Sequence, residues 1–164
     1  MSERQRGASV TLGRIAARAD APDSSPNYAS GHIRMRIFLV EDSAAVAARL
    51  TELLGDLPGT QLVGHAVDAP TAIRRIAELA PDVTILDLSL RSGTGFDVLK
   101  SLGALATRPV AILFTNYVSP PVRRFAARNG ADYFYDKAED VGALRDTLAA
   151  LVRERPRHVA GPSL

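Results

Sequence analysis

The sequence of 164 residues contains no cysteine, and it has no long apolar run. Without cysteine, neither disulfide bonds nor thiolate chemistry are available. The three histidines, at positions 32, 65 and 158, are too scattered to show the ligand spacing of a zinc site. No apolar stretch approaches the ~20 residues that span a bilayer, and the N-terminus lacks the apolar core of a signal peptide. We therefore expect a cytoplasmic protein without a membrane partner.

Net charge and lysine are also scarce. The formal net charge is only +2, which is too small to indicate nucleic-acid binding by itself. The arginines at 153, 155 and 157 are interpreted as the solvated end of a helix, so we expect no nucleic-acid partner. Lys100 and Lys137 are the only lysines among 20 basic residues. Each is therefore a candidate for a role that arginine does not fill.

The composition divides the chain into three parts. Residues 1–34 are rich in Ser, Ala, Arg, Pro and Gly and cannot bury enough apolar surface to offset the entropy of ordering. We expect a disordered or weakly ordered extension over 1–34, one domain over 35–153 and a short flexible tail over 154–164. The tail is too short for an output domain, which favours a domain that acts alone.

From Met35 onward, apolar runs alternate with stretches of helical periodicity. The runs predict five strands, at 35–40, 61–66, 83–87, 110–115 and 132–135. The intervening segments carry apolar residues at helical spacing, and the last such stripe covers 141–152. Strands that alternate with helices predict an α/β fold with a parallel sheet. We expect a flavodoxin-like (βα)5 three-layer sandwich with strand order 2-1-3-4-5.

Polar residues stand where the predicted strands end. Glu41 and Asp42 follow the first strand, Asp87 ends the third, Thr115 ends the fourth, and Lys137 follows the fifth. Open parallel sheets bind their ligands at the carboxyl ends of the strands. We therefore expect three carboxylates, a hydroxyl and an ammonium group to converge at one edge of the sheet.

Three crowded carboxylates repel one another unless a cation lies among them, and hard oxygen ligands suit Mg²⁺. Beside such a cation, Asp87 is able to attack phosphorus and form an acyl phosphate. Thr115 and Lys137 would then supply a donor and a counter-charge to the phosphoryl oxygens. Each residue alone has an ordinary explanation, for example Asp42 as a helix N-cap or Lys137 as a surface charge. Their joint occurrence at matching strand ends favours a site.

Residues 35–153 resemble the receiver domain of bacterial response regulators. The matching segments are 38–42 (FLVED), 83–88 (VTILDL), 93–96 (GTGF), 112–116 (ILFTN) and 130–137 (GADYFYDK). The chain departs from the family's usual residues at Arg91 and Ala138, where proline is common, and at Asn116, where a small residue is usual. None of these departures removes a reacting group.

The resemblance implies a role for each residue at the predicted site. Asp87 would be the phosphoacceptor, and Thr115 and Lys137 would contact the phosphoryl group. Asp42 would bind Mg²⁺ directly, Glu41 mainly through water, and Ser89 through its backbone carbonyl. Phe134 would be the aromatic partner of Thr115 in a conformational switch.

The function implied is phosphorelay signalling, not an enzymatic reaction. A histidine kinase or phosphotransfer protein would supply the phosphoryl group, and a downstream protein would bind the face formed by the fourth helix, fifth strand and fifth helix. Two alternatives are a receiver-like binding module that needs no phosphorylation and an aspartyl-nucleophile phosphatase. Such a phosphatase needs a second aspartate two residues after the nucleophile, where this chain has Ser89.

Overall fold

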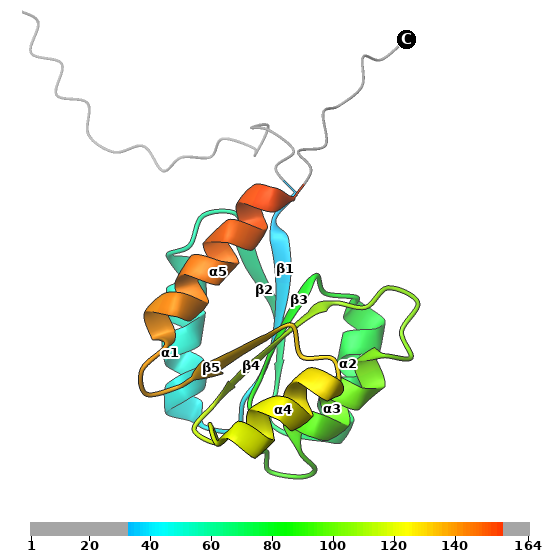
Figure 1. The fold of residues 1–164 in the computed structure, drawn as a ribbon. Coiled ribbons are helices and arrows are strands. Elements are labelled where there is room, and N and C mark those ends of the chain that lie inside the picture. Colours follow the sequence, from blue (N-terminus) through cyan, green and yellow to red (C-terminus); the bar gives the residue numbers. More distant parts are fainter. Residues whose placement is uncertain (1–32, 156–164) are drawn as a thin grey trace, which may run out of the picture. The chain divides into compact units, whose positions relative to one another are not determined.

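The computed structural model describes residues 33–155 as five alternating strands and helices (Figure 1). The predicted flanking segments, 1–34 and 154–164, lie almost wholly outside the described residues. The strands are β1 Met35–Val40, β2 Thr60–Ala66, β3 Val83–Leu86, β4 Val110–Thr115 and β5 Tyr133–Asp136. The helices are α1 Ala44–Gly55, α2 Ala69–Leu79, α3 Gly95–Leu102, α4 Pro120–Arg128 and α5 Val141–Glu154.

The five strands form one parallel sheet in the order β2-β1-β3-β4-β5, which confirms the predicted topology. Helices α1 and α5 cover one face of the sheet, and α2, α3 and α4 cover the other (Figure 1). Among residues 33–155, no helix combines the length and apolar character needed to cross a bilayer. The strand order places the change in winding direction between β1 and β3, where ligands of such sheets bind.

The alternation of side chains along each strand divides the core into two layers. Ile37 and Leu39 of β1 pack with α1 and α5, whereas Phe38 and Val40 pack with α2 and α3. Strands β1, β3 and β4 are buried on both faces, which explains why their sequences read as continuous apolar runs.

Side-chain caps fix where three helices begin. The Ser43 hydroxyl accepts a hydrogen bond from the amide of Val46 at the start of α1. Asp68 caps α2 in the same way, and Thr94 forms a reciprocal capping box with Asp97 at the start of α3. These helices begin at the edge where the strands end, so the caps also fix the loops around the candidate site.

Gly95 holds the loop between β3 and α3 against the end of β3. It is buried, and its amide donates to the carbonyl oxygen of Leu88. A Cβ atom at this position would overlap the carbonyl group of Asp87 and press on the Cα of Leu88. The absence of a side chain therefore allows α3 to begin directly behind Asp87.

Substitution Gly95→Ala should destabilise the domain, because the added methyl group displaces the main chain of Asp87. We expect a loss of about 2 kcal/mol in the free energy of unfolding, as for other overpacked sites. Gly142→Ala is the matched control, because nothing lies within 4 Å of its added Cβ in α5. Urea unfolding measures both variants, and equal stability of Gly95→Ala and wild type would contradict the contact.

Candidate functional site

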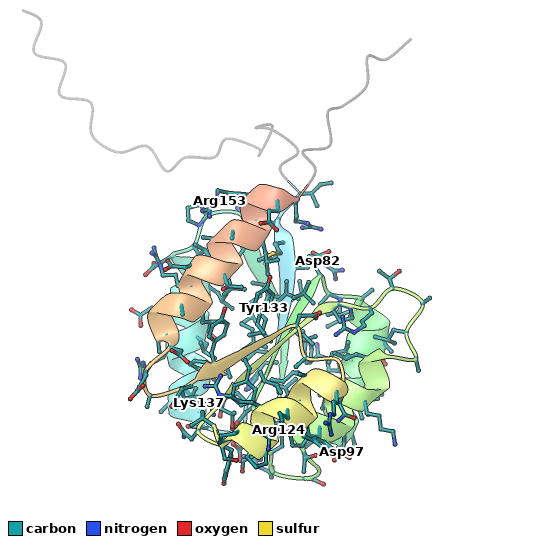
Figure 2. The ribbon with its side chains drawn as sticks, in the orientation of Figure 1. Asp82, Asp97, Arg124, Tyr133, Lys137 and Arg153 are labelled. Carbon is teal, nitrogen blue, oxygen red and sulfur yellow. The ribbon has the colours of Figure 1, made fainter. Side chains whose placement is uncertain are left out.

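The carboxyl ends of β1, β3, β4 and β5 bring the predicted site residues to one end of the sheet. Lys137 lies at that end in Figure 2, opposite Asp82 and Arg153. Two main-chain bonds hold this edge together: the Asp87 amide donates to the carbonyl of Val40, and the Lys137 amide donates to the carbonyl of Thr115. The residues at the ends of four separate strands are thus fixed relative to one another by the sheet.

Lys137 lies between two carboxylates. Its Nζ is 2.6 Å from Oε2 of Glu41 and 2.7 Å from Oδ2 of Asp87. The side chains are 9% exposed for Lys137, 2% for Glu41 and 6% for Asp87. At this depth the carboxylates would repel each other strongly without a cation, because screening by water is weak. The single ammonium group offsets that repulsion.

Glu41 is held at both carboxylate oxygens. Oε2 pairs with Lys137, and Oε1 accepts a hydrogen bond from the Ser43 amide at 3.0 Å. Burial nevertheless raises the pKa of Glu41 above its usual 4.5, against the lowering effect of Lys137 and Ser43. The cost of removing the charge from water therefore outweighs the contacts that favour it.

Asp87 has one oxygen paired and one unpaired. Its Oδ2 accepts from Lys137, but the buried Oδ1 has no hydrogen-bond partner among residues 33–155. One oxygen each from Glu41, Asp42 and Asp87 lies within 4.8 Å of the others. A cluster of hard oxygen donors fits a magnesium ion, and so does a member carboxylate that has one buried oxygen unsatisfied. Asp42 is half-buried, so this cluster borders solvent.

Two further residues of the predicted site lie at the end of β4 and in the loop after β3. Thr115 is fully buried at the end of β4, and its hydroxyl accepts from the Tyr117 amide at 3.3 Å. Ser89 is exposed in the loop after Asp87, where it forms an isolated antiparallel bridge with Thr94.

Phe134 lies on β5 and packs against the core layer that α2, α3 and α4 cover. Its ring is half-buried, and the guanidinium of Arg123 in α4 lies over it at 4.5 Å from the centroid. Arg123 also donates through Nε to the carbonyl of Val118, in the loop that follows Thr115. Through these two contacts, Arg123 links β5 to the segment between β4 and α4.

Three features of the site were not anticipated from the sequence. Ser43, and not Asp42, caps α1, which leaves the Asp42 carboxylate in the acidic cluster. His65 places Nε2 2.7 Å from the carbonyl oxygen of Glu41. Arg123 covers Phe134. Only the position of His65 at the end of a predicted strand offered a signal. The Ser43 cap depends on loop geometry, and the contact of Arg123 with Phe134 depends on how α4 packs against the sheet.

The departures from the family's usual residues are accommodated without disturbing the cluster. Where proline is common, the Ala138 amide donates to a carboxylate oxygen of Asp136 at 2.8 Å, a bond that proline cannot make. The Arg91 amide likewise donates to the carbonyl of Val67. Asn116 is exposed.

Comparison with known proteins identifies the class to which this fold belongs. Residues 37–149 match the family described as the response regulator receiver domain. The crystal structure of the response regulator domain of Thermotoga maritima CheB has a TM-score of 0.65 and 25% identity, over 73% of this chain and 94% of that one. The chain therefore belongs to the response regulator receiver domain family, which acts in phosphorylation-based two-component signalling.

Similar full-length proteins carry more than this domain. A protein-glutamate methylesterase/protein-glutamine glutaminase of Carboxydothermus hydrogenoformans is 32% identical over 139 residues, 80% of this chain and 41% of that protein. The DNA-binding transcriptional activator DevR/DosR of Mycobacterium tuberculosis is 30% identical over 124 residues, 70% of this chain and 57% of that protein. The chain thus spans only part of the length of either relative.

Proposed function

We propose that this protein is a phosphoryl-accepting receiver that takes part in signal transduction in the cytoplasm. Its acceptor would be Asp87, and its donor a histidine kinase or phosphotransfer protein. The observation that carries the proposal is the pairing of Asp87 with Lys137, beside an oxygen of Asp87 that has no partner among residues 33–155. This arrangement leaves one carboxylate oxygen of Asp87 without a protein partner, while the ammonium group of Lys137 holds the other.

The proposed reaction is a single phosphoryl transfer. An oxygen of Asp87 forms a bond to phosphorus, and the bond from phosphorus to the donor's nitrogen or oxygen breaks. The donor leaves with the bonding electron pair and takes up a proton from solvent. Lys137 and the Thr115 hydroxyl lie at the same end of the sheet, so they would contact the phosphoryl oxygens in the product.

Asp42, Asp87 and the backbone carbonyl of Ser89 would hold Mg²⁺, with Glu41 bound mainly through water. The ion would neutralise charge on the phosphoryl group during transfer. The closeness of the three carboxylates supports this assignment, as does the unpaired Oδ1 of Asp87. The receiver fold itself is not enzymatic, and Ser89 stands where an aspartyl phosphatase needs its second aspartate.

Asp87→Ala should abolish phosphorylation, because it removes the carboxylate that would accept the phosphoryl group. Incubation with acetyl phosphate and Mg²⁺ should add one phosphate to the wild type, as measured by intact mass. Asp56→Ala, at an exposed position beyond α1, is the control and should be modified like the wild type. Stoichiometric modification of Asp87→Ala would refute the assignment. An unmodified wild type would favour a phosphorylation-independent binding module.

We further propose that Thr115 and Phe134 form the switch that signals to a downstream protein at the face of α4, β5 and α5. A phosphoryl group on Asp87 would draw the Thr115 hydroxyl away from the Tyr117 amide. The Phe134 ring would then move into the vacated space and leave Arg123. This is a local charge change that biases a two-state element. Stacking of Arg123 on the ring would favour the resting state by about 0.5–1 kcal/mol.

Arg123→Gln should therefore shift the domain toward its activated state. Beryllofluoride, a phosphoryl analogue, should move the amide NMR signals of residues 115–150 in the wild type. In Arg123→Gln the same signals should already be displaced part of the way before it is added. The control is Arg124→Gln, which changes the adjacent exposed arginine on α4 (Figure 2). Shifts confined to the loops around Asp42 and Asp87 would contradict the switch.

A further inference from the structure

The ladder between β1 and β2 ends beside the acidic cluster. Val40 pairs with Ala66, and the Glu41 amide donates to the carbonyl of Ala66 at 3.0 Å. In a regular parallel ladder, the carbonyl of Glu41 would next accept from the amide of Asp68. The chain leaves the strand before that point, because Asp68 becomes the N-cap of α2 and its side chain accepts from the Thr71 amide.

The side chain of His65 takes the place of that missing main-chain donor. Its Nε2 lies 2.7 Å from the carbonyl oxygen of Glu41. A carbonyl oxygen only accepts hydrogen bonds, so Nε2 carries a hydrogen here whatever the protonation of Nδ1. The imidazole is half-buried on β2, and its strand neighbour on β1 is Leu39.

With this bond, Glu41 is fixed at four atoms. Its amide is held by Ala66, its carbonyl by His65, and its two carboxylate oxygens by Ser43 and Lys137. Asp42 follows directly in the chain, so the orientation of the Glu41–Asp42 peptide determines where the Asp42 carboxylate lies. A donor on the Glu41 carbonyl therefore also restrains the next carboxylate of the cluster.

We propose that His65 is a positioning residue of the magnesium site. Its Nε2–H fixes the Glu41–Asp42 peptide after the ladder has ended, and so holds the carboxylates of Glu41 and Asp42 ready for the ion. Groups that orient metal ligands in this way commonly change metal affinity when they are removed. The inference rests on the proposed Mg²⁺ site, but it does not require that Asp87 be phosphorylated.

The test is the dissociation constant for Mg²⁺, measured by NMR titration of the full chain. The wild type is compared with His65→Gln, His65→Asn and His65→Leu. In Gln the side-chain amide nitrogen reaches about as far as Nε2 of histidine, whereas in Asn it reaches only as far as Nδ1. Leu fills a similar volume without a donor. His65→Leu and His65→Asn should weaken Mg²⁺ binding by about 10-fold. His65→Gln should remain close to wild type, and thermal melts without Mg²⁺ show whether each variant is folded.

Gln61→Leu is the matched control, because Gln61 is exposed at the opposite end of β2. It should leave Mg²⁺ affinity unchanged. Wild-type Mg²⁺ affinity in His65→Leu would overturn the proposal. Equal weakening of Mg²⁺ binding in His65→Gln and His65→Asn would also overturn it, because the imidazole would then act through packing and not through its Nε2–H. A wild type that does not bind Mg²⁺ would also overturn it. A wild type that binds Mg²⁺ but accepts no phosphoryl group would refute only the proposed function.

Discussion

The ammonium group of Lys137, held between Glu41 and Asp87, is the interaction on which the rest of the site depends. The two carboxylates are almost fully buried, and burial raises the pKa of Glu41. A single cation that contacts both permits them to lie on adjacent strands. Lys137 is able to make both contacts because β5 ends beside β4 and its amide is bonded to Thr115.

One lysine does not pair with every buried carboxylate oxygen, and the oxygen that it leaves unpaired suits the site for its proposed chemistry. Lys137 occupies one oxygen of Asp87 and leaves the other buried without a partner among residues 33–155. Such a group costs about 1–3 kcal/mol when it remains unsatisfied. A divalent cation would recover that cost while it neutralises the third carboxylate, from Asp42. The domain thus holds unsatisfied charge at the carboxyl ends of its strands.

The fold was predictable because its signals are local and repeated. The apolar runs of β1, β3 and β4 are continuous since both faces are buried, and four strand ends carry the polar residues that converge. Strand bounds were less predictable: β3 ends at Leu86 and leaves Asp87 just outside, and β5 begins at Tyr133. Hydrogen bonding and not composition decides these bounds.

The contacts that position the site residues were less predictable than the residues themselves. Capping of α1 by Ser43 depends on the turn that follows Asp42, because either side chain suits an N-cap. The bond from His65 to Glu41 joins residues that are 24 apart in sequence, and it arises only because β2 turns into α2 there. Arg123 reaches Phe134 through the packing of α4 on the sheet, which periodicity alone does not specify.

The most direct test of this account is the free energy of unfolding of wild type and Lys137→Met as a function of Mg²⁺ concentration. Without Mg²⁺, the variant should be less stable by about 3 kcal/mol, because it leaves buried carboxylates without a cation. Saturating Mg²⁺ should recover most of that loss. Without Lys137 the acidic cluster is more negative than in the wild type, so the ion binds the folded variant more tightly and stabilises it. Equal stability of the two proteins without Mg²⁺, or a loss that Mg²⁺ does not reduce, would contradict the account.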